Sequence, residues 1–226
     1  MKILAADTST TSLSVCLADG EKILASRFLH LGDTHSRHLL FLMEGVLSDA
    51  KFLFKDLDAL AVSLGPGSFT GLRIGVGTVK GLAMALGIPV FGFSTLAILA
   101  ARFSGFPYPL CTMLDARRGE VYAALFDVSG KTPKEIFPPC VERPEVFLEK
   151  LSGPMLFVGS GALFYQEKIV KKMGENALWP GRLQHEPDSG ELIALAMEKE
   201  ISDAVHPGLI LPMYLRKSDA ELQKKS

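Results

Sequence analysis

Apolar and polar residues alternate through the opening part of the chain, and this alternation predicts three strands. Residues 2–7 form an apolar run, and in residues 12–19 the apolar residues recur at every second position. Asp19-Gly20 is a two-residue sequence that tight hairpin turns prefer, so residues 21–28 are expected to pair back as a third strand. The chain is therefore predicted to open with a three-stranded meander.

The next segment has helical periodicity and an unusual outer side. One face is apolar and is made of Leu39, Leu42, Met43, Val46 and Leu47. The opposite side carries His38, Phe41 and Gly45, which place an aromatic ring and a bare backbone where charged residues are expected. We interpret these three residues as part of a partner surface. The alternative is a single exposed phenylalanine, which needs no partner.

A glycine-rich stretch, residues 65–75, joins an apolar strand at residues 58–64 to a long helix that is expected to end near Leu86. The helix has a core stripe made of Leu72, Val76, Val79, Ala83 and Leu86. Beside it lies a second uncharged face made of Gly71, Ile74, Gly75, Thr78, Gly81 and Ala85. Each interior glycine costs a helix about 1 kcal/mol relative to alanine, so these glycines indicate close backbone approach. We predict that Gly71, Ile74, Gly75 and Thr78 contact a partner, with tight packing on the chain's own sheet as the alternative.

The second half of the chain repeats the pattern of the first. An apolar strand ends in Asp115, and the alternating strand after it ends in Asp127, twelve residues later. The same spacing separates Asp7 from Asp19. A repeat at half the chain length predicts two similar lobes with a cleft between them.

The remaining apolar runs complete the predicted fold. Further strands are expected at residues 90–93, 135–141 and 155–159, and further helices at residues 95–103, 162–173 and 189–201. We predict an α/β protein with three parts: an N-terminal lobe with both interface helices in residues 1–105, a C-terminal lobe in residues 106–208, and a segment and tail in residues 209–226 that return to the N-terminal lobe.

Composition excludes several classes of function. The chain of 226 residues has 24 basic and 25 acidic residues, so it lacks the basic excess of a stand-alone nucleic-acid binder. Its cysteines, Cys16, Cys111 and Cys140, are odd in number and set among apolar residues, which favours the cytoplasm. The long helix has fewer than the roughly 20 consecutive apolar residues that a helix needs to cross a membrane. Residues 59–114 contain no Asp or Glu, so this region offers no carboxylate base and no ligand for a hard cation.

Four motifs together resemble the TsaB (YeaZ) family. They are the turn Asp7-Thr8-Ser9-Thr10, the glycine-rich stretch GPGSFTGLRIG at residues 65–75, and segments 115–122 and 212–216. The resemblance extends over the whole chain, and the glycine-rich stretch is its most specific part. It implies two ribonuclease-H-like lobes of the actin, hexokinase and Hsp70 (ASKHA) superfamily. It also implies a role in making threonylcarbamoyladenosine beside the anticodon of tRNA.

The resemblance also implies that this chain has lost its catalytic site. In the superfamily, a strand-ending aspartate and two turns hold metal and phosphate, a role that would fall on Asp7, Thr8, Ser9 and Thr10 and, in the second lobe, on Asp115, Arg117 and Arg118. Arg117 and Arg118 replace the small residues that close approach to a triphosphate requires. Thr95 and Leu99 stand where the catalytic relative TsaD is expected to have two metal-binding histidines. We therefore expect vestigial phosphate turns, no catalytic residue and no metal site.

The expected function is that of a non-catalytic scaffold subunit. The resemblance implies partnership with TsaD and with the ATPase subunit TsaE, which are expected to hold the metal and ATP, and contact with tRNA only through the complex. The surface formed by the two interface helices also predicts a homodimer. Two alternatives remain open: an ATP-dependent phosphotransferase or ATPase of the same superfamily, and a glycoprotease-like metallopeptidase.

Overall fold

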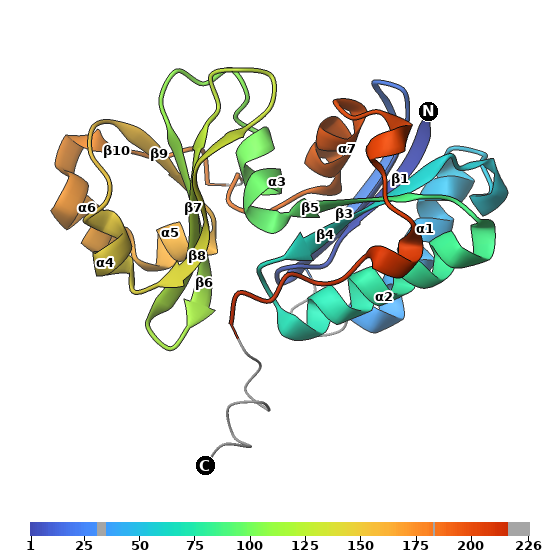
Figure 1. Ribbon diagram of the computed structural model, residues 1–226, viewed down its shortest axis with the longest axis horizontal. Helices are drawn as coiled ribbons and strands as arrows, with labels where there is room; N and C mark the ends of the chain where they lie inside the picture. Colours follow the sequence, from blue (N-terminus) through green and yellow to red (C-terminus); the bar gives the residue numbers. More distant parts are fainter. Residues whose placement is uncertain (31–34, 183, 217–226) are drawn as a thin grey trace, which may run out of the picture.

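The fold consists of two five-stranded sheets that lie side by side, each covered by helices (Figure 1). The structure is a computed structural model and describes residues 1–30, 35–182 and 184–216. The first sheet contains β1 (Lys2–Asp7), β2 (Ser12–Asp19), β3 (Lys22–His30), β4 (Ala59–Gly65) and β5 (Val90–Ser94). The second contains β6 (Leu110–Arg117), β7 (Glu120–Asp127), β8 (Lys134–Glu142), β9 (Met155–Val158) and β10 (Ala177–Leu178).

The two sheets have the same topology, which confirms the repeat predicted from the aspartate spacing. Their strand orders are β3-β2-β1-β4-β5 and β8-β7-β6-β9-β10. In each sheet the first strand pairs antiparallel with the second and parallel with the fourth. Asp7 and Asp115 therefore lie near the ends of equivalent strands. The sequence pattern did not predict β10, because two residues are too short to show an alternation.

The meander and the two helices that follow it match the sequence pattern. Gly20 has the positive φ that the predicted hairpin turn requires, and β3 runs two residues beyond its predicted end. Helix α1 (His35–Asp49) and helix α2 (Phe69–Leu86) cover one face of the first sheet. All the predicted core residues of α1 are buried, as are four of the five in α2, Leu86 being partly exposed. The Ser68 hydroxyl caps the start of α2, and Gly87 ends it in the left-handed conformation.

Two short helices pack across the boundary between the halves of the chain. Helix α3 (Thr95–Ala101) lies between the sheets: Ile98 packs with the first sheet, and Leu96, Leu99 and Ala100 pack into an apolar cluster with the second. Helix α7 (Ser189–Met197) follows the second sheet, yet Leu192 and Ile193 pack on the face of the first sheet opposite α1 and α2. Placing residues 189–197 in the C-terminal lobe is therefore corrected. Helical periodicity shows that one face of a helix is covered, but it does not show by which sheet.

The remaining helices cover the outer face of the second sheet. They are α4 (Pro144–Leu148), α5 (Ser160–Phe164) and α6 (Gln166–Met173). The chain also has 3-10 turns at Phe54–Asp56, Gly174–Asn176, Ile201–Asp203 and Pro207–Leu209. The single helix predicted at residues 162–173 is two helices, because the chain bends at Tyr165. In the part of the chain that the structure describes, no helix combines the length and apolar character that crossing a membrane demands.

The C-terminal segment lies along α2 and then reaches the second lobe (Figure 1). Lys80 Nζ donates to Gly208 O at 2.9 Å, and Met213 N donates to Leu64 O at 2.7 Å. Further on, Arg216 and Glu120 on β7 form an ion pair at 3.3 Å. The predicted tail beyond Arg216 lies outside the described residues.

Candidate partner surface and inter-lobe cleft

The outer side of α2 presents a stripe of exposed residues at helical spacing. They are Thr70, Arg73, Gly77, Gly81 and Met84, of which only Arg73 is charged. The neighbouring helix α1 exposes Leu40 and Phe41. Phe41 and Met84 keep 64% and 60% of their surface in contact with solvent, although each is a large apolar side chain. We call these seven residues the α1–α2 surface.

Gly71 and Gly75 do not face outward as predicted. Both are buried, and a Cβ added at Gly71 would overlap with Thr8 O, while one added at Gly75 would overlap with Thr8 Oγ1. The Thr8 hydroxyl also donates to Gly71 O at 2.7 Å. The close approach that we inferred from these two glycines therefore occurs within the lobe, between α2 and the turn after β1.

Gly45, the third glycine of the predicted surface, also makes a close contact within the chain. A Cβ at Gly45 would overlap with the guanidinium group of Arg27, which comes from β3 and pairs with Asp49 at 2.6 Å. His38, Ile74 and Thr78 are half-buried, and Ile74 packs against the core under α2. Their contact with a partner, like that of Phe41, stays a prediction.

Gly77 is the position that the sequence argument missed, whereas Gly81 was placed on the uncharged face but not among the partner contacts. Nothing in the described structure lies within 4 Å of a Cβ placed at either residue. The exposed stripe is rotated by about 100°, one residue's step around the helix, from the face that we predicted. The spacing of Gly77, Gly81 and Met84 (i, i+4, i+7) was the signal that could have identified it.

A cleft of about 790 Å3 separates the two lobes at the ends of β1 and β6. Both lobes and the C-terminal segment line it, through residues 9–11, 66–74, 114–117, 122, 160, 186 and 213–216. At its mouth, Tyr214 stacks on Phe69 with 4.5 Å between ring centroids, and the Arg73 guanidinium lies 4.0 Å from the Phe69 centroid. The predicted cleft is thus present, and the C-terminal segment forms part of its wall.

The first predicted phosphate turn is buried at three of its four residues. Asp7, Thr8 and Ser9 are fully buried, and the Asp7 carboxylate accepts hydrogen bonds from the hydroxyl and N–H groups of Ser9. Ser68 N donates to Ser9 O at 2.7 Å, and Gly67 packs against the same carbonyl group. Of this turn, Ser9 and Thr10 line the cleft, together with the next residue, Thr11. These residues do not fit a site in which the turn backbone approaches a metal-bound nucleotide.

Burial controls the ionisation of Asp7. It raises the pKa of this carboxyl above its usual value, and the hydrogen bonds to Ser9 act in the opposite direction. A carboxyl whose pKa is raised on folding stabilises the fold fully below its unfolded pKa. This contribution is lost as the pH rises toward the folded pKa.

Asp7→Asn is therefore expected to be more stable than the parent protein at neutral pH. The advantage should grow as the pH rises from about 4 through the folded pKa and then stay constant, because asparagine does not ionise. Urea unfolding of both proteins between about pH 4 and about pH 8 measures the difference in free energy of unfolding. A difference that does not change with pH would mean that the pKa of Asp7 is not raised.

The second predicted turn is the tip of the β6–β7 hairpin. Arg117, Arg118 and Gly119 have φ values of 61°, 54° and 80°, and Arg117 N donates to Asp115 Oδ1 at 2.8 Å. Both arginines are exposed, so bulky side chains surround a turn that a triphosphate would have to approach closely. Gly161 at the start of α5 packs against the backbone of Leu114 and Asp115, as Gly71 packs against Thr8 in the first lobe.

The positions equivalent to metal ligands do not form a site. Thr95 and Leu99 on α3 are buried between the sheets. Among the residues that the structure describes, no three His, Cys, Asp or Glu side chains are grouped so that they could hold a metal ion.

A short crossing segment that sequence reasoning missed joins the lobes at the cleft. His185 Nδ1 accepts a hydrogen bond from Gly159 N at 3.2 Å in the second lobe, and burial lowers the pKa of this imidazole. Glu186 accepts a hydrogen bond from the Thr10 hydroxyl at 2.9 Å in the first lobe. Arg102 pairs with Glu191 at the start of α7 at 2.8 Å. No periodic pattern marks this segment, which explains why the sequence did not reveal it.

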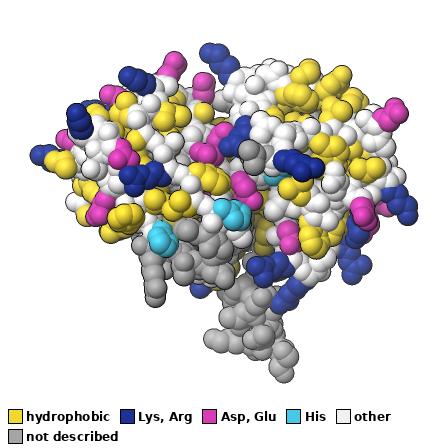
Figure 2. Space-filling view, turned by 180° about the vertical axis from the view of Figure 1, so that it is seen from behind, with side chains coloured by type: hydrophobic (Ala, Val, Ile, Leu, Met, Phe, Trp, Pro, Cys, Tyr) yellow, Lys and Arg dark blue, Asp and Glu magenta, His cyan; other side chains and the backbone are white. Residues whose placement is uncertain are grey.

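Among the residues that the structure describes, charges of both signs are interspersed over the rear face of the molecule (Figure 2). The distribution agrees with the nearly balanced count of 24 basic and 25 acidic residues.

Comparisons with known proteins identify the family. The family model described as "TsaD: tRNA N6-adenosine threonylcarbamoyltransferase" matches residues 30–224. The chain is 35% identical over 224 residues to the Bacillus subtilis tRNA threonylcarbamoyladenosine biosynthesis protein TsaB, covering 98% of this chain and 96% of that protein. The Escherichia coli protein of the same name is 37% identical over 169 residues, or 71% of this chain and 72% of that one.

Solved structures agree with this relationship. YeaZ from Pseudomonas aeruginosa superposes with a TM-score of 0.81 at 30% identity, over 95% of this chain and 99% of that one. The ROK hexokinase from Thermus thermophilus, at 13% identity, covers 88% of this chain and 100% of that one with a TM-score of 0.51, and this likeness concerns the fold alone. The predicted resemblance is confirmed: the chain belongs to the TsaB (YeaZ) family and has the ASKHA fold.

Proposed function

We propose that this chain is a non-catalytic scaffold subunit that acts in the cytoplasm in the threonylcarbamoyladenosine modification of tRNA. In this proposal it dimerises with the catalytic relative TsaD, works with the ATPase subunit TsaE, and contacts tRNA only through the complex. Family membership supports the pathway, because the Bacillus subtilis and Escherichia coli relatives are named for the biosynthesis of this nucleoside.

The α1–α2 surface is the observation that carries the scaffold role. Phe41 and Met84 are large, apolar and exposed, and Gly77 and Gly81 leave the backbone of α2 uncovered on its exposed side. Large apolar side chains grouped on one surface are typical of a protein interface. Helices can approach each other closely where one of them carries small residues. The half-buried His38, Ile74 and Thr78 flank this surface and are proposed as its edge.

The turns at the lobe ends support a non-catalytic role. Asp7 is fully buried and engaged with Ser9, and Arg117 and Arg118 occupy the tip of the second turn. In our proposal these turns are vestigial, and ATP and metal belong to the partner subunits.

Phe41→Asp is expected to weaken the binding of TsaD by about 30-fold or more. A charge would replace a central apolar side chain, and losses of about 2 kcal/mol or more are typical of such anchor residues. Calorimetry with purified TsaD measures the affinity, and the threonylcarbamoyladenosine content of tRNA from cells carrying the variant measures the consequence. Light scattering should show that the variant no longer forms the homodimer, because a two-fold interface would contain the substitution twice.

Phe164→Asp is the matched control. Phe164 is a phenylalanine on α5 of the second lobe and is 71% exposed, so its replacement changes charge and area in the same way at a distant site. The Phe164→Asp protein should bind TsaD as tightly as the parent protein does, and cells carrying it should keep the threonylcarbamoyladenosine content of their tRNA. Full affinity and full modification in a folded Phe41→Asp protein would contradict the proposed surface.

One observation favours a second candidate, an ATP-dependent phosphotransferase or ATPase. The cleft of about 790 Å3 is large enough for a nucleotide, and Ser160 and Thr10 reach it. Turnover of ATP with magnesium by the purified chain, abolished by Asp7→Ala, would favour this enzyme over the scaffold. Nothing in the described site supports the glycoprotease-like alternative.

A further inference from the structure

The free edge of β5 is the feature that the proposed function leaves unused. β5 is the last strand of the first sheet, so one side of its backbone has no neighbouring strand along most of its length. The β8 edge of the second sheet contains Pro138 and Pro139, which cannot donate to a further strand, and the β10 edge is only two residues long. β5 has neither protection.

The backbone of Gly92 points outward from this edge. Val90 and Val205 exchange two hydrogen bonds of 3.0 Å in an antiparallel bridge, so the N–H and C=O groups of Val90 face away from β4. The orientation repeats every second residue, which turns the N–H and C=O groups of Gly92 the same way. In the part of the chain that the structure describes, neither group has a hydrogen-bond partner. The chain around Val205 thus begins a sixth strand but does not continue it past Gly92.

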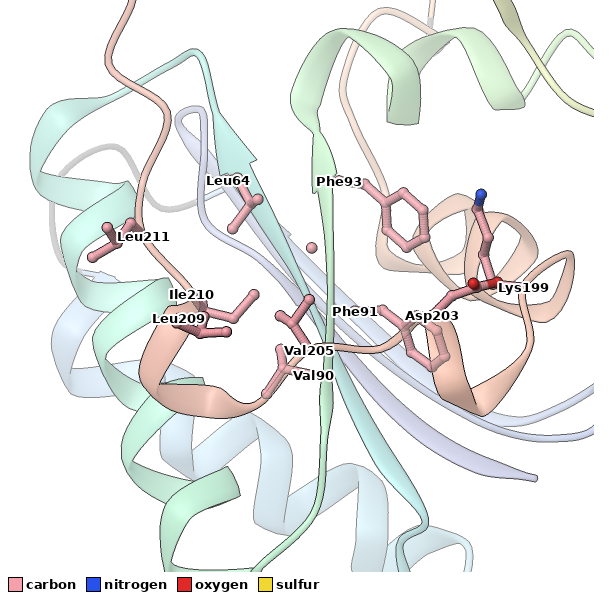
Figure 3. A pocket seen from close by; sticks show the side chains of 11 residues that line it. Leu64, Val90, Phe91, Phe93, Lys199, Asp203, Val205, Leu209, Ile210 and Leu211 are labelled. Carbon is pink, nitrogen blue, oxygen red and sulfur yellow. The ribbon is translucent and has the colours of Figure 1, made fainter.

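A groove of about 480 Å3 lies over this edge. Figure 3 shows Leu64 and Leu211 on one side of β5, and Phe93 and Lys199 on the other. Leu211 is 67% exposed although it is apolar. A Cβ at Gly92 would come within 2.7 Å of Leu64 Cδ1, so glycine leaves the floor of the groove uncovered.

Charged side chains of both signs lie at the groove. Asp203 lines it and accepts a hydrogen bond from Glu200 N at 3.0 Å, so its carboxylate caps its own turn. Lys199 is exposed beside Phe93, between the exposed Glu198 and Glu200, and none of the ion pairs between described residues includes it. An acidic residue of an occupant would pair with this lysine alone.

We propose that the β5 groove binds an extended peptide segment of a partner protein, which adds to the sheet as a short strand opposite Gly92 and places an acidic side chain beside Lys199. Main-chain hydrogen bonds to Gly92 supply affinity, and alternate side chains of the peptide enter the two apolar walls. The proposal is independent of the α1–α2 surface, which lies on other elements.

Amide hydrogen exchange on the full chain tests the proposal directly. The probe is an acetylated six-residue peptide in which valine and threonine alternate and the last residue is glutamate. Its addition is expected to slow exchange of the Gly92 amide by about tenfold or more, since that amide gains a hydrogen bond. The Phe91 and Phe93 amides, which point toward β4, should not change. A peptide of the same length with proline at alternate positions should have no effect.

Charge exchange tests the role of Lys199. Lys199→Glu is expected to weaken the glutamate peptide by about two- to fivefold and to bind a lysine-ended peptide more tightly than the parent protein does, because the pair is exposed. Lys172→Glu, the same change on the exposed side of α6, should leave both affinities unchanged. Phe41→Asp should also bind the peptide normally.

Three results would overturn the inference. They are absence of peptide binding into the millimolar range, binding that does not protect Gly92, and protection of Gly92 that rises with protein concentration when no peptide is present. The last result would assign the edge to a second copy of this chain.

Discussion

Leu192→Ala is expected to lower the free energy of unfolding by about 2–5 kcal/mol, a large part of the total stability of a protein of this size. Leu192 on α7 is fully buried against the first sheet, in a cluster with Ile3 and Ala61. Alanine would leave a cavity between α7 and that sheet. Urea unfolding measures the loss, and Leu163→Ala, on the exposed side of α5, is the control that should change stability little.

The strands in which amide exchange accelerates show which of the two sheets α7 stabilises. In Leu192→Ala, amide exchange should accelerate first in β1 and β4, although Leu192 follows the second sheet in sequence. Acceleration confined to β6 and β9 would mean that α7 stabilises the second lobe instead.

Alanine substitutions at Gly71 and Gly77 are expected to have opposite effects on stability. Gly71→Ala should lower the free energy of unfolding by about 1–3 kcal/mol, because the new methyl group would overlap with the buried carbonyl oxygen of Thr8. Gly77→Ala should raise it by about 0.4–1 kcal/mol, because the site is open and alanine is the better helix former. Thermal unfolding of both variants measures the two shifts. Destabilisation by Gly77→Ala in the isolated chain would contradict the open stripe on α2.

Gly77 is also the position at which to test close approach of a partner helix. Gly77→Leu should leave the fold intact and weaken TsaD binding by about ten- to hundredfold, from about 1–3 kcal/mol of overpacking. The same substitution at Gly75 would disturb the contact with Thr8, so weaker binding could not be distinguished from loss of the fold.

Strand and helix positions could be predicted well from the sequence because their patterns are local. The alternation in residues 12–19 predicted a strand and the stripe from Leu72 to Ala83 predicted a covered helix face, and both elements were confirmed, although the strand is buried on both faces. The repeated aspartate spacing predicted two similar lobes because Asp7 and Asp115 lie near the ends of equivalent strands. These inferences required no knowledge of distant contacts.

The candidate site was predicted less well, since it depends on which side of a helix remains uncovered. Glycine has no side chain, so hydropathy does not reveal whether Gly71 faces Thr8 or solvent. The exposure of Phe41 agrees with the sequence pattern, whereas Leu40 and Met84 were assigned no role. The groove over β5 was invisible to sequence analysis because residues 64, 92, 199 and 211 come together only in the folded chain.

The packing of α7 on the first sheet has a consequence for synthesis. The five strands of the first sheet leave the ribosome about a hundred residues before α7 is complete. At roughly 5–20 residues per second, the apolar face that Leu192 later covers stays bare for roughly 5–20 s. A nascent chain in this interval is a candidate for chaperone binding and for aggregation with its neighbours. A chain that terminates before Ser189 would keep this face uncovered permanently, however well its first sheet had formed.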